Sequence, residues 1–268
     1  MEAASARAAR SFGASANVAT VRALVQRSRN ELLRVPGAAI PGILAPTIFF
    51  LGLTAVFGSL TLLPGFDTDR YQSFLIPVSM MQGAGFTGAA TGVNLARDIE
   101  QGWFDRLLAS PAPRPVLLAG LVVSASLRAL VPATVLLIIG FSLGVGWPGI
   151  PGLLLAFGLV MGTGTVAALW GCTLALKFKS QSAAPLMQSG MFILVLFTTA
   201  YAPMALLQPW LADVAAINPM TDVIEAARQG FLTGSITWGE TWPGLVALAG
   251  LIAVLGALAL RGMSRTGR

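Results

Sequence analysis

Long uncharged stretches separated by short polar segments dominate the pattern of this chain. Five stretches hold no Asp, Glu, Lys or Arg, and they cover residues 35–66, 71–96, 129–176, 180–212 and 241–260. About 20 helical residues cover a hydrocarbon core of roughly 30 Å, so four of these stretches predict one membrane-spanning helix each. Residues 129–176 are too many for one helix and contain a run rich in Gly and Pro, which predicts two helices joined by a turn.

The pattern therefore predicts an all-α membrane protein with six transmembrane helices. These helices cover about 38–61, 72–95, 116–143, 152–176, 185–203 and 241–260. They divide the chain into an N-terminal segment over 1–37, a transmembrane domain over 38–261 and a short tail over 262–268. Because six is an even number, both termini are expected on the same side of the membrane.

The basic residues indicate which side that is. Of the 17 Lys and Arg residues, 14 lie in segments on the side of the termini, and only Arg70 and Arg228 lie on the opposite side. Loops rich in Lys and Arg stay in the cytoplasm, so both termini are expected there. The same distribution explains the net charge of +6 without a nucleic-acid partner, since basic and aromatic residues do not alternate along the chain.

The segment before the first span predicts an interfacial amphipathic helix. Between Val18 and Arg34, apolar residues such as Val21 and Leu24 fall on one helical face, and polar residues such as Arg27 fall on the other. This basic helix suits the anionic inner leaflet. The alternative is a helix packed against the protein's own cytoplasmic loops. The first 36 residues lack the apolar core of a secretory signal, so we expect them to be retained.

Composition excludes most enzyme classes. Hydrophobic residues make up 55% of the chain and charged residues 10%, which is too little charge to cover a water-soluble enzyme. With no His and one Cys, imidazole-based triads, His-ligated metals and disulfides are excluded. No phosphate-binding loop occurs, and the predicted spans carry no carboxylate for ion coupling. We expect a non-catalytic subunit that binds no cofactor or metal and is driven from outside the chain.

The segment between the second and third predicted helices is the most unusual part of the chain. Its candidate functional residues are Asp98, Glu100, Gly102, Trp103, Phe104, Asp105, Arg106, Leu107, Leu108 and Pro111. A short helix from about Trp103 to Ala109 would place Phe104, Leu107 and Leu108 on one apolar face, with charges beside it. Such a face fits either a groove on a partner or the lipid surface.

A second polar segment precedes the last predicted span. Its candidate residues are Asn218, Pro219, Thr221, Glu225 and Arg228. Asn218 is a good N-cap, Pro219 suits the first helical turn, and the acidic and basic residues follow the direction of the helix dipole. The segment is too short to cross a bilayer, so it predicts a short helix on the extracellular side.

Together, these two segments resemble the signatures of ABC-2 type permeases, especially daunorubicin-resistance-type drug exporters. The first shares their order of acidic residues, Gly, Asp-Arg, an apolar pair and Pro, and the second shares their Asn-Pro-x-Thr and Glu-Ala-x-Arg elements. The resemblance implies the permease subunit of an ATP-driven exporter in the bacterial plasma membrane. It would move a hydrophobic or amphiphilic small molecule, such as a drug or a lipid-like compound, out of the cell.

The resemblance also implies partners. Two copies of a separate ATPase subunit would bind ATP and Mg, and a second permease, identical or homologous, would complete the substrate path. The segment from Asp98 to Pro111 would be the coupling helix that receives ATPase movement, and the N-terminal helix would brace the same ATPase. Two alternatives stay open: a glycan- or lipid-exporting ABC permease, and a non-transporting scaffold or sensor that binds a cytoplasmic partner.

Arg128 is the one charged residue inside a predicted span. An unpaired charge at mid-bilayer is costly, so this side chain is expected to face protein or water. Either it lines the inner part of the pathway and attracts anionic or polar substrate groups, or the third helix begins late. In the second case residues 129–145 span the membrane, and Arg128 reaches the cytoplasmic edge.

Two sets of apolar positions are candidates for contacts within the assembly. Three pairs have the GxxxG spacing that can bring helices of neighbouring subunits close together: Gly88 with Gly92, Gly140 with Gly144, and Gly158 with Gly162. The alternative is that these spacings arise by chance, since 30 of the 268 residues are glycine. Six further residues form soft apolar surface that suits a lipophilic substrate or an ordinary core. They are Met80, Met81, Met161, Met187, Met191 and Phe192.

Overall fold

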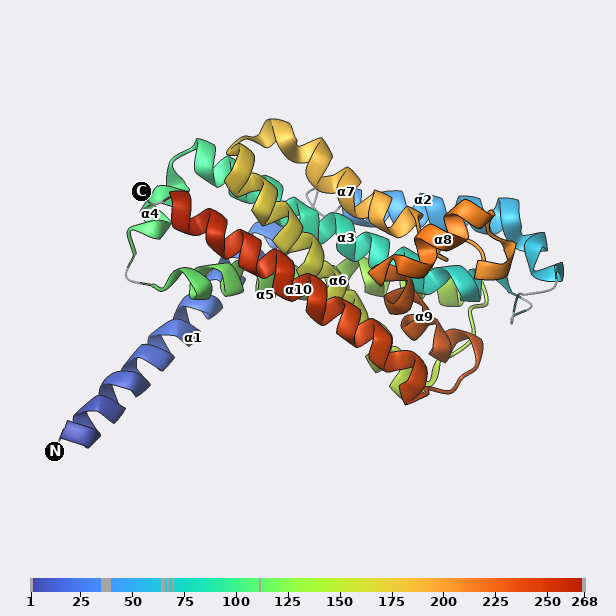
Figure 1. Cartoon of the computed structure of the whole chain (residues 1–268), viewed down its shortest axis with the longest axis horizontal. Helices are drawn as coiled ribbons and strands as arrows, with labels where there is room; N and C mark the ends of the chain where they lie inside the picture. The colour runs from blue at the N-terminus through green and yellow to red at the C-terminus, as the bar shows by residue number, and fades with distance from the viewer. Residues whose placement is uncertain are drawn as a thin grey trace.

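The structure is a computed structural model that describes residues 2–34, 40–63, 66, 68, 70–110 and 112–266. Every regular element in these residues is helical, which confirms the all-α class (Figure 1). The elements are α1 (Glu2–Arg34), α2 (Ile40–Phe57), η2 (Gly58–Leu62), α3 (Tyr71–Glu100), α4 (Trp103–Leu108), α5 (Arg114–Ser142), α6 (Gly149–Phe178), η3 (Gln181–Ala183), α7 (Ala184–Leu196), η4 (Met204–Leu206), α8 (Pro209–Ile217), α9 (Pro219–Leu232) and α10 (Trp238–Thr266).

The bundle has two distinct ends (Figure 1). We call one the α4 end, where α3 and α6 finish, α5 begins and α10 finishes, and the other the α9 end, where α8 and α9 lie. The two marked termini both lie toward the α4 end, where α1 projects away from the bundle. Four exposed Trp residues lie on elements of the α9 end, as at a membrane interface. They are Trp147, Trp210, Trp238 and Trp242.

The central helix is α3, which packs against α2, α5, α6 and α7. Its approach to α6 depends on glycine: a Cβ added to Gly92 would lie 2.3 Å from the carbonyl carbon of Gly171. A Cβ on Gly88 would lie 2.5 Å from the carbonyl oxygen of Gly164. Gly88 and Gly92 therefore pack inside this chain, and the expectation that they contact a second permease is wrong. Gly162 likewise meets Leu248 of α10.

Four segments among the described residues are long and apolar enough to cross a membrane: Gly42–Leu62, Arg114–Ser142, Gly149–Phe178 and Trp238–Arg265. They match four of the six predicted spans. The helix predicted over 72–95 is present as α3, but it carries more polar residues and is largely buried. The count of six transmembrane helices and the cytoplasmic location of the termini stay predictions.

The predicted extent of the fifth span, residues 185–203, is wrong because α7 ends at Leu196. Thr198 explains the ending: its hydroxyl donates to the carbonyl of Val195 and accepts from the backbone N–H of Ala200. A hydroxyl that bonds the local backbone offers it an alternative to the helix. Pro203 then begins the short connection to α8. As a result, α7 has only 13 residues, about 20 Å of helix.

Candidate functional site

The short helix α4 exists close to its predicted position, but its apolar side is turned inward. Phe104 is fully buried in a cluster that includes Leu24 of α1 and Leu117 of α5. Leu107 and Leu108 are half-buried against the same cluster. The prediction that Phe104, Leu107 and Leu108 form a docking face is therefore wrong for Phe104, because other helices of this chain cover the Phe104 side chain.

The surface that α4 leaves open is polar. Asp105 and Arg106 are exposed, as are Gln101 before the helix and Ala109 after it. Gly102 separates α3 from α4 with a φ of +69°, and no atom would lie within 4 Å of an added Cβ. Its role is therefore conformational, because side-chain-bearing residues are strained in this left-handed region. Pro111, also predicted for this site, lies outside the described residues.

Arg27 joins α1 to this site. Its Nη2 donates to both carboxylate oxygens of Asp98 at 3.1 Å, and its guanidinium carbon lies 3.7 Å from the centre of the Trp103 ring. One side chain of α1 thus contacts the last turn of α3 and the first residue of α4. Sequence reasoning placed Arg27 on the solvent face of α1. The contact supports the alternative in which this helix packs against the protein's own loops.

Glu100 joins the end of α3 to the connection between α6 and α7. Its carboxylate accepts hydrogen bonds from the Ser180 hydroxyl at 2.8 Å, and from the backbone N–H and side-chain amide of Gln181 at 2.9 and 2.6 Å. Arg97 also donates to the Gln181 side chain. The bonds from Gln181, and then the one from Ser180, hold the pKa of the Glu100 carboxyl below its ordinary value.

At the α9 end, Asn218 caps α9 as predicted and also binds α7. Its side-chain oxygen accepts from the N–H of Met220 at 3.0 Å, and its amide donates to the carbonyls of Leu194 and Phe197, both at 2.8 Å. Pro219 occupies the first turn of α9. The Thr221 hydroxyl donates to the carbonyl of Ala215 at the end of α8.

Arg228 was expected near the outer surface, but its side chain is 1% exposed. It donates to the carbonyls of Phe74, Thr199 and Ala200 at 3.1, 2.7 and 2.8 Å, and its guanidinium carbon lies 3.6 Å from the centre of the Phe74 ring. Glu225 accepts from Arg228 at 2.8 Å and also from the Thr199 hydroxyl. The buried Arg228 side chain, paired with the exposed Glu225, thus binds the non-helical residues that follow α7.

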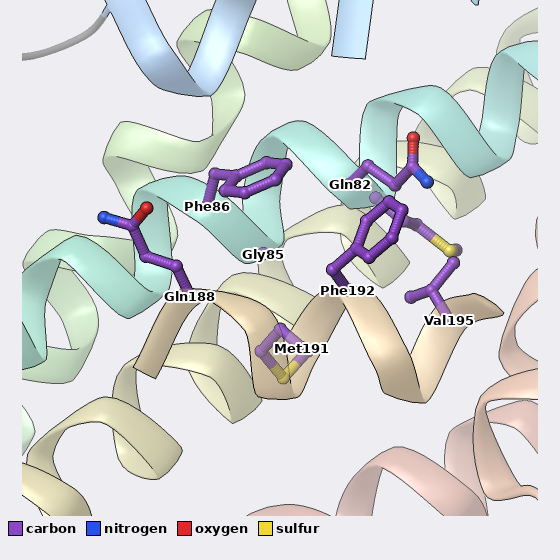
Figure 2. Close-up of a pocket in the computed structure, with 8 residues that line it drawn as sticks. Gln82, Gly85, Phe86, Gln188, Met191, Phe192 and Val195 are labelled. Carbon is purple, nitrogen blue, oxygen red and sulfur yellow. The ribbon is translucent and has the colours of Figure 1, made fainter. Parts of the chain in front are cut away.

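A pocket lies between α3 and α7 (Figure 2). Figure 2 shows Gln82 and Phe86 of α3 beside Gln188, Phe192 and Val195 of α7. Three of the six residues predicted to form soft apolar surface line it, and these are Met81, Met191 and Phe192. The lining therefore combines thioether and aromatic groups with two uncharged amides, and it contains no charged side chain.

Arg128 lies within α5, which runs without interruption from Arg114 to Ser142. The helix itself therefore begins well before Arg128, and the alternative in which residues 129–145 span the membrane with Arg128 at the cytoplasmic edge stays a prediction. The Arg128 guanidinium donates to the Thr91 hydroxyl of α3 at 2.7 Å and lines a polar pocket with Asn94 and Ser124. The expectation that this charge faces protein is confirmed. Its contribution to a substrate pathway stays a prediction.

Sequence reasoning missed the partners of the predicted residues. Arg27, Ser180, Gln181 and Thr199 each bind a predicted site residue, but they lie 26 to 81 positions away along the chain. The Ser-Gln-Ser run at 180–182 carries a recognisable signal, because Ser180 accepts from the N–H of Ser182 as an N-cap does. Nothing local identifies which carboxylate reaches that run.

Comparison with known proteins agrees with the resemblance to ABC-2 type permeases. Residues 19–232 match the model of the family described as ABC-2 type transporter. The daunorubicin resistance ABC transporter permease protein DrrB1 of Streptomyces coeruleorubidus is 27% identical over 84% of this chain and 79% of its own length. A putative transport permease, ycf38, of Pyropia yezoensis is 29% identical over 82% and 76%. The probable multidrug ABC transporter permease YbhR of Escherichia coli K12 is 26% identical over 67% and 50%.

Proposed function

Because this chain belongs to the ABC-2 type transporter family, we propose that it is the transmembrane permease subunit of an ATP-driven exporter. A membrane permease that works with an ABC ATPase follows from the family. The finer proposal is an assembly of two permeases and two ATPase subunits in a bacterial plasma membrane, with the α4 end in the cytoplasm. ATP and Mg would bind to the ATPase chains.

The observation that carries this proposal is the way α4 is held. Phe104 buries its inner side, Arg27 ties it to α1, and Glu100 ties the preceding turn to η3. Its outer side leaves Asp105 and Arg106 exposed. The inner side of α4 packs on the bundle, and its open side carries charges of both signs. A partner that binds the open side could therefore displace several helices at once.

The transported molecule is proposed to be hydrophobic or amphiphilic and uncharged where it contacts the chain. The chemistry of the surface between α3 and α7 supports this, since Met81, Met191 and Phe192 supply apolar surface and Gln82 and Gln188 supply neutral hydrogen-bonding groups. The pocket itself has a volume of about 10 Å³, room for about one water molecule, so a transported molecule would have to move α7 away from α3. A charged glycan would find few matching groups in such a lining.

The experiment is purification of the chain from its native host under gentle extraction, followed by native mass spectrometry to identify any ATPase subunit that remains bound. We expect two permeases with two ATPases. The double variant Asp105→Arg with Arg106→Glu should lower the recovered ATPase by about tenfold, because it reverses both charges on the open face of α4. Arg265→Glu is the matched control, since Arg265 is an exposed charge in the last turn of α10 at the same end.

The outcomes separate the competing functions. A stable chain that carries no ATPase after gentle extraction with added nucleotide would contradict the exporter and favour a membrane scaffold or sensor. Full ATPase recovery with the double variant would show that the partner docks elsewhere. Equal losses in the double variant and in Arg265→Glu would indicate a general charge effect and would also contradict docking on α4.

A further inference from the structure

The helix α7 differs from the other helices that run between the two ends. It has 13 residues, against 29 or 30 in α3, α5, α6 and α10. Its outer side is open, with Leu186 47% and Ile193 49% exposed. A helix with so little packing depends on what holds its ends, and the structure supplies polar anchors at both of them.

The anchor at the start of α7 lies beside the proposed ATPase contact. Glu100 accepts three hydrogen bonds from Ser180 and Gln181, which directly precede α7. Glu100 is also the last residue of α3, two positions before the hinge glycine Gly102. Any displacement of α4 relative to α3 therefore acts close to the bonds that hold the start of α7.

The anchor at the other end comes from α9. The last carbonyls of a helix have no partner within the helix. The Asn218 amide satisfies the carbonyl of Leu194 in the last turn of α7 and that of Phe197, the first residue after it. Arg228 satisfies the carbonyls of Thr199 and Ala200 a little further on. The residues of α9 that form its sequence signature thus close the end of α7 as well as beginning their own helix.

Between the anchors, residues of both α7 and α3 line the pocket in Figure 2. Soft thioether and aromatic contacts such as those of Met191 and Phe192 tolerate small displacements better than hydrogen bonds do. The polar bonds at the ends therefore determine how closely α7 approaches α3.

We propose that Glu100, Asn218 and Arg228 are positioning residues that hold α7 against α3 and thereby set the width of the pocket between them. Asn218 and Arg228 fix the α9 end, and Glu100 fixes the end that lies beside α4. That this pocket receives the transported molecule rests on the proposed function. The positioning of α7 itself does not, because it follows from contacts within this chain.

The test measures access to the pocket by thiol labelling of the full chain in lipid nanodiscs. Gln188→Cys places a thiol in the pocket lining, and the only native cysteine, Cys172, is fully buried. The reaction rate with a small maleimide is compared with and without Asn218→Asp. Aspartate keeps the oxygen that caps α9 but lacks the amide that donates to Leu194 and Phe197.

We expect Asn218→Asp to raise the labelling rate by about fivefold or more, the factor that corresponds to losing one net hydrogen bond. Arg228→Lys should raise the labelling rate less than Asn218→Asp does, because Lys keeps the positive charge. It should still raise the rate, because Lys lacks the forked guanidinium that reaches the carbonyls of Thr199 and Ala200. Glu100→Gln should also raise it, from the opposite end. If Asn218→Asp fails to fold, Asn218→Ser replaces it, since Ser also caps a helix and lacks the amide.

Gln229→Met is the matched control. Gln229 is the neighbour of Arg228 and is equally inside the protein, but its side chain binds Thr237 and Thr241 around the start of α10. It should leave the labelling rate unchanged. An unchanged rate in Asn218→Asp, or an equal rise in Gln229→Met, would overturn the proposal. Because labelling needs neither ATPase nor substrate, failure of the exporter assignment would leave this result interpretable.

Discussion

The two ends of the molecule hold their polar residues in opposite ways. At the α4 end, the Arg27 side chain that reaches Asp98 is 41% exposed, and Glu100 lies at the surface. At the α9 end, the Arg228 side chain is 1% exposed and donates to three backbone carbonyls and to Glu225. Exposed ion pairs contribute about 0–1 kcal/mol. Glu225 is itself 46% exposed, so the difference lies in the buried carbonyls, each of which costs about 1–3 kcal/mol when it loses its donor.

This difference suggests that the two ends of the molecule have different mechanical roles. Contacts that are weak one by one can be remade when a partner pushes on α4, so the α4 end suits a site that receives movement. A buried cation that satisfies several carbonyls has no comparable alternative arrangement, so the α9 end suits a fixed support. The helix α7 connects the two kinds of anchor.

The largest expected effect comes from removing the buried cation. Arg228→Met keeps apolar contact with the Phe74 ring but leaves the carbonyls of Phe74, Thr199 and Ala200 without their donor. We expect the thermal unfolding midpoint in detergent to fall by about 10 °C or more, because three buried carbonyls lose their donor. Arg70→Met, at an exposed Arg that binds one carbonyl of the same end, should change it by no more than about 2 °C. Similar shifts in both variants would remove the contrast between the ends.

A nearly equal effect is expected from Phe104→Asp at the α4 end. Phe104 is fully buried, and truncating a buried Phe typically costs about 3–5 kcal/mol before a carboxylate is added. We expect aggregation or a lowered midpoint in size-exclusion and thermal measurements, with Phe104→Leu close to the native chain. A monodisperse Phe104→Asp protein with a native midpoint that fails only to bind the ATPase would return Phe104 to a partner-facing role.

The smallest expected effect concerns pH at Glu100. Hydrogen bonds lower its pKa below the ordinary 4.5, so its contribution is present above that value and is lost as the pH falls through the lowered pKa. A spin label at Ser182→Cys should report constant mobility of η3 from neutral pH down to about 5 and increased mobility in stronger acid. Glu100→Gln should abolish this dependence, and a transition near neutral pH would contradict the assignment.

Local patterns predicted the elements of the fold well. The uncharged stretches located α2, α5, α6 and α10, the Gly- and Pro-rich run located the turn between α5 and α6, and Asn218 with Pro219 located the start of α9. These features depend on neighbours in the chain, such as hydropathy over one helix length and capping within one turn. The end of α7 was missed because the Thr198 hydroxyl competes with the helix only through its specific backbone bonds.

Local patterns identified the candidate sites only in part, because they do not show how helices pack against one another. Residues of both signatures were identified, yet Phe104 was taken as a surface anchor and Arg228 as an outer charge. The spacing of apolar residues shows which side of a helix is apolar. It does not show which neighbouring helix, lipid or partner covers that side. The glycines show the same limit, since Gly88 and Gly92 allow a close approach and only the packing shows that α6 fills it.

The sequence by itself determined the membrane class, the helical segments and the two signatures that identify the family, because hydropathy, charge bias and helix capping act between residues near in the chain. Only the tertiary structure decided that Arg27 holds α4, that Glu100 holds the start of α7, and that α9 closes its end. These contacts join residues up to 154 positions apart, as between Arg228 and Phe74. They arise from how whole helices pack, which no local pattern encodes.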